Sequence, residues 1–422
     1  MTAWQLSTLG AYGFLILITL SRHFVCSYQQ RFLRILTPEH PQVSPEQAPL
    51  VSILVPAKDE GDKIALCLES LCNLDYPAYE VLVIDDRSED NTAEIVRQYE
   101  EQYPFLRLIH VEELPLGWTG KTHALQYGQQ FARGEWLLFV DADTTHHPDT
   151  LSVTIHDACE HQLDMLTALP TLKCQSFWEK VIQPYASTCL IILFPFSKAN
   201  NHEDRSGAWG NGQFILIHRD AYDHIGQHRS VRDKFVEDIA LARRVREHGL
   251  RLNIVSASQL FAVRMYSSMQ EIIRGWSRIF YSATDCRPGK LFALLIFIAL
   301  FSITPYALMF AGGAAWAMGT ETVMSTTLFA MGAVHELIQL TLYARIYPQT
   351  RTKRRYLAFR LCAVLAMCYV LLKTIRMCST HQVNWRGTAY GVEMQHGLSL
   401  ETGAGSVAAE GSEEKMPVRK SA

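Results

Sequence analysis

No glycine-rich phosphate loop and no dinucleotide-binding fingerprint occurs in this 422-residue sequence. A Rossmann oxidoreductase is therefore disfavoured, because that class holds its cofactor on glycine-rich backbone between a strand and a helix. The ten cysteines form no CxxC pair and no regular framework, which favours reduced thiols over disulfides or a zinc site. The net charge is only −3, so nothing global indicates nucleic-acid binding, and we expect no nucleic-acid partner.

Charged residues are missing from long stretches of the chain. Met1–Ser21 is uncharged and contains the run GFLILITL. A cleaved signal peptide would begin with basic residues and end at a small-residue cleavage site, and neither is present, so we interpret this segment as a retained membrane anchor. Three later segments are candidate spans of the roughly 20 residues that a bilayer requires: Leu291–Thr320, Val323–Ala344 and Tyr356–Met377.

Basic residues beside these segments predict their orientation, since loops rich in Lys and Arg stay in the cytosol. None precedes the first anchor, whereas Arg22, Arg31 and Arg34 follow it, and the loop Arg345–Arg355 contains RTKRR. We therefore expect Arg22–Lys290 to be cytosolic. Four complete crossings would then leave the residues after the last span on the outer side.

Composition divides the chain into segments. A proline-rich polar stretch, PEHPQVSPEQAP, suits neither a helix nor a central strand and reads as a linker. The last residues are rich in Gly, Ala, Ser and Glu, which is typical of disorder. The predicted segments are an anchor at 1–24, a linker at 25–50, an α/β domain at 51–285, a transmembrane region at 286–378, a segment containing WRGTAY at 379–397, and a disordered tail at 398–422.

Apolar strand patterns alternate with helical patterns between residues 51 and 145. VSILVPA, YEVLVIDD, RLIHVEE and EWLLFVDADT suit strands, and the segments between them have apolar residues at helical spacing. This alternation predicts an α/β domain with a mainly parallel sheet, in which ligands bind beyond the carboxyl ends of the strands. Three polar clusters fall at those ends: Lys58-Asp59-Glu60, Asp85-Asp86 and Asp141-Ala142-Asp143.

Asp141 and Asp143 directly follow the apolar strand WLLFV. In an extended segment their carboxylates point to the same side, where they repel each other unless a cation lies between them. Oxygen ligands of this kind suit Mg²⁺ or Mn²⁺, which commonly bridges to substrate phosphates. The alternative is a solvated acidic turn, or caps for the helix that begins near Pro148.

Three other polar positions have both a structural and a functional interpretation. Asp86 could belong to a helix-capping turn or face the hydroxyls of a ligand. Lys121, in GWTGK, could lie in an ordinary turn or bring a cation to a diphosphate at a helix N-terminus. Glu237 and Asp238 could stabilise the first turn of a helix, or one of them could be a general base that deprotonates an acceptor hydroxyl.

The ordered set VSILVPAKDE, VIDDRS, GWTGK, FVDADT, GNGQFILIHRDAY, VEDIALARR and RGWSR resembles the inverting glycosyltransferases of family 2, which have the GT-A fold. The resemblance is closest to the membrane branch that includes ceramide glucosyltransferase, the hopanoid-associated transferases and the diaponeurosporenoate glucosyltransferases. It implies a bacterial inner-membrane enzyme that moves a sugar from a nucleotide-sugar, with UDP as the expected nucleotide, to a hydroxyl or carboxyl group of a lipid acceptor.

The resemblance also implies a role for each matching residue. Asp141 and Asp143 would bind the metal, Asp238 would be the catalytic base, and Glu237 would be its neighbour in the ED motif. Lys121 would approach the donor diphosphate. The pocket for base and ribose would contain Pro56, Ala57, Glu60 and Asp86. The acceptor side would contain Gly212, Gln213, Arg274, Trp276 and Arg278.

One motif departs from the family pattern. The (Q/R)xxRW motif of the family places Arg directly before Trp, whereas Gly275 separates Arg274 from Trp276 here. Processive polysaccharide synthases generally keep the motif intact, so the departure argues against a polymer-forming enzyme. Trp276 could instead anchor an interfacial helix, which is a common use of Trp at a membrane surface. A polysaccharide synthase and a non-catalytic membrane scaffold of the same fold are the alternatives to a lipid glycosyltransferase.

Three features concern the membrane directly. Cys189–Phe196 is too short to span, and could lie in the interface or form a buried core helix. His335-Glu336, inside a candidate span, should face other helices or water. The WRGTAY segment resembles a C-terminal motif of the ceramide-type branch and is expected on the cytosolic side, which conflicts with four complete crossings. Either Tyr356–Met377 does not fully cross, or another segment dips into the bilayer.

Overall fold

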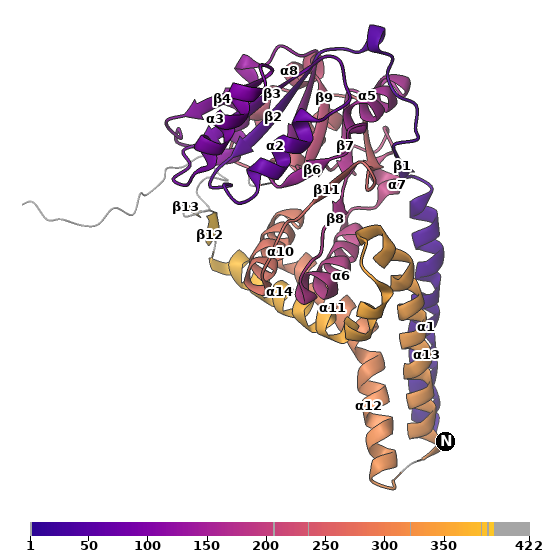
Figure 1. Cartoon of the computed structure of the whole chain (residues 1–422). Helices are drawn as coiled ribbons and strands as arrows, with labels where there is room; N and C mark the ends of the chain where they lie inside the picture. The colour runs from indigo at the N-terminus through magenta and orange to yellow at the C-terminus, as the bar shows by residue number, and fades with distance from the viewer. Residues whose placement is uncertain are drawn as a thin grey trace, which may run out of the picture.

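The computed structural model describes residues 2–205, 207–234, 236–320, 322–380, 382–385 and 388–391. An α/β domain lies at one end of the molecule, and long helices extend away from it (Figure 1). The described part of the domain contains an eight-stranded sheet in the order β1-β10-β7-β9-β5-β2-β3-β4. Its strands are β1 Arg34–Ile35, β2 Val51–Ala57, β3 Tyr79–Asp86, β4 Leu106–Val111, β5 Trp136–Val140, β7 Met165–Leu169, β9 Phe214–His218 and β10 Leu252–Ser256.

The prediction of a mainly parallel α/β sheet is confirmed. β9 runs antiparallel to both of its neighbours, β5 and β7, and the other pairs in this sheet are parallel. The chain also enters the sheet within the expected linker at 25–50, because β1 pairs with β10. Before β1, helix α1 (Ala3–Gln30) continues past residue 24.

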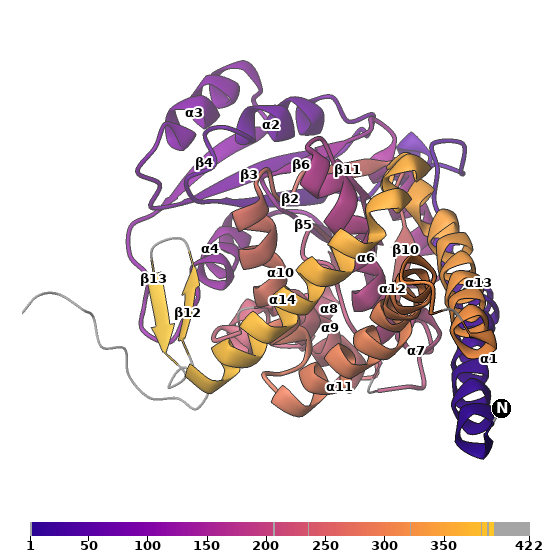
Figure 2. The ribbon, with the colours of Figure 1, turned by 90° about the horizontal axis from the view of Figure 1, so that it is seen from below.

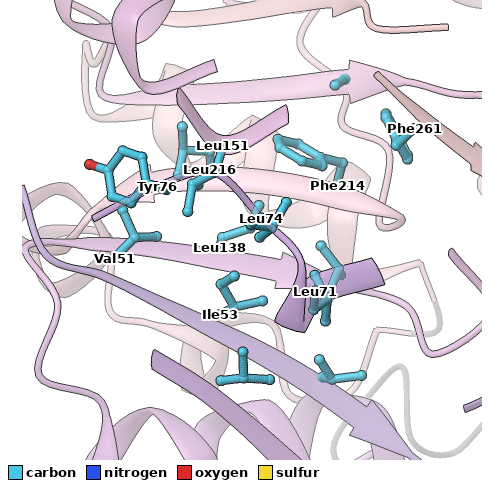
Figure 3. Packing of buried hydrophobic residues seen from close by; sticks show 14 of the residues in the cluster. Val51, Ile53, Leu71, Leu74, Tyr76, Leu138, Leu151, Phe214, Leu216 and Phe261 are labelled. Atoms are coloured by element: carbon cyan, nitrogen blue, oxygen red, sulfur yellow. The ribbon is translucent and has the colours of Figure 1, made fainter. Parts of the chain in front are cut away.

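Side chains alternate between the two faces of the sheet, as the strand period of two requires. Ile53 and Val55 pack in a cluster with helices α2 (Ile64–Cys72), α3 (Thr92–Gln102) and α5 (Thr150–Glu160), part of which is drawn in Figure 3. Leu54 packs in a second cluster with α4 (Gly120–Gly128), α8 (Arg219–His224) and α9 (Glu237–Glu247). The sheet is therefore covered by helices on both faces, and its strand ends remain as the place for a site.

Within the part of the chain that the structure describes, four helices are long and apolar enough to cross a membrane: Ala3–Gln30, Pro288–Ala317, Val323–Ile346 and Arg354–Ser379. This confirms the expectation of one N-terminal and three C-terminal apolar helices. The second of them bends, because a π-helical turn at Ala299–Ile303 and Pro305 separate α11 (Pro288–Ile298) from α12 (Thr304–Ala317). The others are α13 (Val323–Ile346) and α14 (Arg360–Thr380).

A third apolar cluster joins the long helices to the α/β domain. It combines α6 (Phe177–Leu193) and α10 (Met269–Ala283) with α11, α13 and α14. Figure 1 shows α6 and α10 between the sheet and the long helices. Residues 189–193 belong to α6, where Cys189 is buried in this cluster and Ile192 is exposed. The helix thus has one face inside the protein and one face outside it.

The polar pair inside α13 faces other helices, as expected. His335 lies between the hydroxyls of Tyr12 and Thr19 of α1, each 2.8 Å from a ring nitrogen. Glu336 pairs with Arg360 of α14. Two smaller sheets complete the described structure: β6 (Thr144–His146), β11 (Phe261–Val263) and β8 (Thr171–Leu172) form one, and the hairpin β12 (Gln382–Trp385) and β13 (Thr388–Gly391) forms the other.

Candidate active site

The acidic residues predicted from the sequence lie at the carboxyl ends of neighbouring strands. Asp86 ends β3, and Asp141 and Asp143 follow β5, with β2 between these two strands. The strands are parallel, so their ends meet at the same edge of the sheet. The structure therefore brings together side chains that are more than 50 residues apart in the sequence.

Lys121 connects the Asp141 side of the site to helix α9. Its Nζ lies 2.7 Å from Oδ1 of Asp141 and 2.7 Å from Oε1 of Glu237. Burial alone would lower the pKa of Lys121, but these two carboxylates raise it above its ordinary value. Lys121 is consequently a fixed positive charge. Helix α4 positions it, because Thr119 caps that helix and its backbone N–H is bonded to the carbonyl of Arg232 over 2.9 Å.

Asp238 begins α9 beside Glu237. Its Oδ2 accepts a 2.7 Å hydrogen bond from the backbone N–H of Gly212, and its Oδ1 accepts one of 2.7 Å from Ile239. Burial, and next the charge of Glu237, raise the pKa of Asp238 to about 7, against the opposing effects of Lys121 and the two backbone N–H groups. A carboxylate with such a pKa can accept a proton near neutral pH, which is what a general base requires.

Asp143 has the properties expected of an incomplete cation site. Its Oδ1 is buried and has no hydrogen-bond partner. Burial, and next the charge of Asp141, raise the pKa of Asp143 to about 7. A divalent cation beside these two carboxylates would stabilise their charged forms, so the residues fit Mg²⁺ or Mn²⁺.

Protein side chains alone do not complete this metal site. Among the described residues, no group of three or more His, Cys, Asp and Glu side chains is arranged to hold a metal ion. Two carboxylates would leave positions for other oxygen ligands, and this is typical of Mg²⁺ sites that share the ion with substrate phosphates. The two carboxylates therefore fit a metal ion that binds together with a phosphorylated ligand.

The residues expected around a base and ribose line the adjacent strand ends. Pro56 and Ala57 end β2, and Asp86 is buried at the end of β3. Arg87 Nε lies 2.9 Å from Oδ1 of Asp86, and a Cβ at Gly120 would lie 2.5 Å from its Oδ2. The glycine at 120 thus lets the first turn of α4 approach the carboxylate closely. Glu60 follows β2, and its backbone N–H donates to Thr92 over 2.8 Å.

The expected acceptor residues do not all lie in one place. Gly212 touches the charged cluster, since a Cβ there would lie 3.1 Å from both Lys121 Nζ and Asp238 Oδ2. Gln213 follows it in the same turn before β9. On α10, Arg274 is exposed, whereas Trp276 is buried in the apolar cluster against Phe280. Arg278 is the hydrogen-bond partner of Tyr266.

Tyr266 lies near the candidate site, and the motifs did not indicate it. Its ring lies directly against Gly275, where an added Cβ would come within 2.0 to 2.3 Å of three ring and hydroxyl atoms. The charges of Asp143 and Asp141 contribute to raising its pKa, after the larger effect of burial. Gly275, the residue that interrupts the Arg-Trp motif, therefore provides the space for a tyrosine near the paired aspartates. A glycine within an otherwise regular helix was the available signal.

Comparison with known proteins finds a family that resembles part of the chain. Residues 52–226 match the family model "Glycosyl transferase family 2". The match covers less than half of the chain, and it places the similarity within the α/β domain. Lys121, Asp141, Asp143 and Gly212 lie within the matched residues of that domain, and Glu237 and Asp238 follow them.

Two relatives and two solved structures are similar to the chain. It is 32% identical over 128 residues to the uncharacterized glycosyltransferase YibD of Escherichia coli, covering 30% of this chain and 34% of that protein. It is 24% identical over 252 residues to 4,4'-diaponeurosporenoate glycosyltransferase of Staphylococcus aureus, covering 59% of this chain and 65% of that protein. The chain thus matches under two thirds of either relative's length.

The first structure is the mannosyltransferase PcManGT of Pyrobaculum calidifontis in complex with GDP-Man and Mn²⁺ (TM-score 0.46, 20% identity, 86% of this chain and 99% of that one). The second is glucosyl-3-phosphoglycerate synthase of Mycobacterium tuberculosis with Mn²⁺, UDP and glucosyl-3-phosphoglycerate (TM-score 0.41, 16% identity, 59% of this chain and 86% of that one).

Proposed function

We propose that this protein transfers a sugar from a nucleotide-sugar, with UDP as the nucleotide, to a hydroxyl or carboxyl group of a lipid by a metal-dependent inverting displacement. The observation that carries this proposal is the pair of 2.7 Å contacts from Lys121 Nζ to Asp141 and Glu237. These contacts connect the paired aspartates to the helix that bears Asp238. A single site thereby combines a place for a leaving diphosphate with a base for the incoming nucleophile.

The donor side uses positive charge where negative charge develops. Asp141 and Asp143 would hold Mg²⁺ or Mn²⁺, which would stabilise the leaving diphosphate. Lys121 would contribute a second positive charge at the same place without any reorganisation, because its carboxylate partners already fix it. The strand ends around Pro56, Ala57 and Asp86 would receive the base and ribose.

The acceptor side supplies the base. Asp238 takes the proton of the acceptor hydroxyl as that oxygen forms a bond to the anomeric carbon. The bond from the anomeric carbon to the diphosphate oxygen breaks at the same time, and the electron pair leaves with the nucleoside diphosphate. Attack from the face opposite to the leaving group inverts the anomeric centre. Gly212 and Ile239 hold the carboxylate of Asp238 in place through their N–H groups during this step.

A lipid acceptor is supported by the position of the site next to the apolar helices. Tyr266, whose pKa is raised in part by Asp143 and Asp141, lies three residues before α10 begins, so this side of the site adjoins the helical layer. α6 carries Phe177, Trp178 and Ile192 exposed on its outer side. Aromatic and aliphatic side chains of this kind suit the boundary of a bilayer, from which a lipid head group could reach Asp238.

We also propose that the α/β domain lies in the cytosol of a bacterial cell and that the protein is integral to the inner membrane. The N-terminus lies at the end of α1 that is far from the sheet (Figure 1). Arg22 is in the last third of α1, Arg31 and Arg34 follow that helix, and the basic loop Arg345–Arg355 begins at the end of α13. Basic residues beside membrane spans are retained in the cytosol.

The decisive experiment compares lipids of cells that express the wild type or Asp238→Asn, with Glu247→Gln on the same helix as a matched control. Mass spectrometry should show one glycolipid that is present in the wild type and in the control and absent in Asp238→Asn. An unchanged lipid profile would refute the lipid acceptor. A polymer in place of a glycolipid would indicate a polysaccharide synthase, and no binding of a UDP-sugar with Mn²⁺ would indicate a non-catalytic scaffold.

A further inference from the structure

Helix α14 runs in a different direction from the other long helices. In Figure 1, α1, α12 and α13 extend away from the sheet, whereas α14 runs crosswise beneath it. In the view from below, α12 is seen end-on and α14 is seen along its length (Figure 2). Within their most apolar windows, α14 is 44% buried inside the protein and α1 only 11%. Length and apolarity alone therefore do not make α14 a crossing helix.

The two faces of α14 differ in what covers them. One face packs against α6, α10 and α11, and residues Ala363, Val364, Met367, Val370 and Leu371 are buried there. The opposite face exposes Leu365, Tyr369 and Leu372, which are four and three residues apart and so share one side of the helix. An exposed apolar stripe on a helix that lies beside membrane-spanning helices needs an apolar environment.

Contacts at its start turn α14 away from the direction of α13. After α13 ends at Ile346, short 3-10 turns at Tyr347–Thr350 and Arg354–Phe359 precede α14. Arg360, the first residue of α14, is fully buried and its guanidinium pairs with Glu336 of α13. The segment between the helices carries Lys353, Arg354 and Arg355, which would attract anionic lipid head groups.

We propose that α14 lies in the cytosolic boundary of the bilayer, with Leu365, Tyr369 and Leu372 among the lipid chains, and does not cross. The helices that cross this bilayer are α1, α12 together with the π turn, and α13. α12 and the π turn together have 19 residues, or about 28 Å of helix, which approaches the thickness of the hydrocarbon core. The chain then crosses three times.

Three crossings have a consequence for the C-terminal hairpin. The basic loop after α13 and the start of α14 are on the cytosolic side, and α14 stays there. Figure 2 shows β12 and β13 at the end of α14, beside the α/β domain. The hairpin that contains Trp385 and Tyr390 therefore belongs to the same side as the candidate active site, which removes the conflict between the charge pattern and the motif.

Nitroxide depth measurements test this arrangement in the full-length protein, in vesicles containing anionic lipid. A nitroxide on a genetically encoded azide side chain leaves the native cysteines unchanged. Leu365 and Leu372 on α14 form one labelled pair, and Leu17 and Phe24 on α1, also exposed and seven residues apart, form the control. Seven residues of a crossing helix rise about 10 Å, so the control pair should differ in depth by nearly that amount.

The two α14 positions should lie at one depth, near the head groups. A difference of about 10 Å between them would overturn the proposal, as would an epitope tag after Ala422 that is accessible only from outside. The inference rests on the membrane part of the proposed function, and the control separates the two. Equal depths for Leu17 and Phe24 would show that α1 does not cross, which would refute the membrane part of the proposed function together with this inference. Different depths in both pairs would refute only this inference.

Discussion

The backbone N–H of Gly212 donates a 2.7 Å hydrogen bond to Oδ2 of Asp238. The same glycine lies so close to the charged cluster that a Cβ would be 3.1 Å from that oxygen, 3.1 Å from Lys121 Nζ and 3.3 Å from Glu237 Oε1. Asp238 is thus oriented from the backbone, at a place where a side chain on residue 212 would crowd the charged cluster. The position of the proposed base depends on this contact.

Gly212→Ala should lower kcat by roughly 10- to 100-fold, because a misplacement of about 1 Å at reacting groups can cost about 100-fold. The protein should still fold, since the atoms nearest the new Cβ are ends of side chains that can move by a few tenths of an ångström. Steady-state kinetics and thermal unfolding measure both effects. Gly289→Ala in α11, where a Cβ would meet nothing within 4 Å, is the control and should be normal. Wild-type kcat in Gly212→Ala would contradict the positioning role.

The pH dependence should report Asp238. The pKa of this carboxyl is raised to about 7 by burial and Glu237, and the base must be ionised to accept a proton. We expect kcat/KM to fall about tenfold per pH unit below pH 7 and to level off above it. Glu237→Gln should move this limb to lower pH, since the charge that raises the pKa of Asp238 is removed. Initial rates between pH 5 and 9 measure both profiles.

Asp238→Asn supplies the matching control for the pH profile. It should reduce kcat by roughly 10²- to 10⁴-fold, the usual contribution of a positioned base. Its residual activity should lack the limb near pH 7. A limb that persists unchanged in Asp238→Asn would assign the titration to another group. Glu247→Gln, on an exposed part of the same helix, should keep the wild-type profile.

The sequence predicted the positions of the charged residues better than their partners. Asp86, Asp141 and Asp143 were placed correctly at one edge because an apolar strand followed by carboxylates fixes where the strand ends. The bridge from Lys121 to Glu237 joins residues more than 100 positions apart, and no local pattern encodes that contact. The assigned roles of these residues remain proposals.

The sequence patterns also do not encode the directions in which strands and helices run. The period of two identifies β9 as a strand, but a parallel and an antiparallel strand have the same alternation. Hydropathy identified α14 as long and apolar, but not its crosswise direction, which depends on contacts with other helices, including α13. β1 has only two residues, too few for any periodic signal.

Asp143→Asn should affect stability and metal binding in opposite directions. The carboxylate is partly buried, repelled by Asp141, and its Oδ1 has no hydrogen-bond partner, so the neutral amide should raise the melting temperature of the ligand-free protein. Mn²⁺ with UDP should stabilise the wild type by about 2.7 kcal/mol at 100 times the Kd. That gain should disappear in the variant. Thermal unfolding in detergent, with and without Mn²⁺ and UDP, measures both.

Asp220→Asn, on the exposed surface of α8, is the control and should keep the full stabilisation by Mn²⁺ and UDP. An equal gain in Asp143→Asn and the wild type would show that Asp143 does not bind the metal. A lower melting temperature of the ligand-free variant would show that its carboxylate stabilises the fold rather than the metal.

Gly275→Ala should displace Tyr266. The added Cβ would come within 2.0 to 2.3 Å of the tyrosine ring, and relief of such crowding typically costs about 1 to 3 kcal/mol. Tyr266→Ala alone should lose packing, but the double variant should be more stable than the sum of the two single effects predicts. Gly313→Ala, a helical glycine with free space around it, should not lower stability. Additive effects would show that the two residues are not coupled.

The buried pair of Arg360 and Glu336 should control the position of α14. Arg360 is fully buried, its Nε donates to Glu336 over 3.0 Å, and Tyr306 donates to the same carboxylate over 2.5 Å. Glu336→Gln leaves the guanidinium without its counter-charge, which should cost about 3 to 5 kcal/mol in thermal unfolding. Replacing both residues by Met should recover most of that loss, because no unpaired charge remains. The same double variant should let the depths of nitroxides at Leu365 and Leu372 diverge, since stability is then restored without the contact that orients the helix. Equal depths in the double variant would show that packing against α6 and α10 alone holds α14 in the boundary.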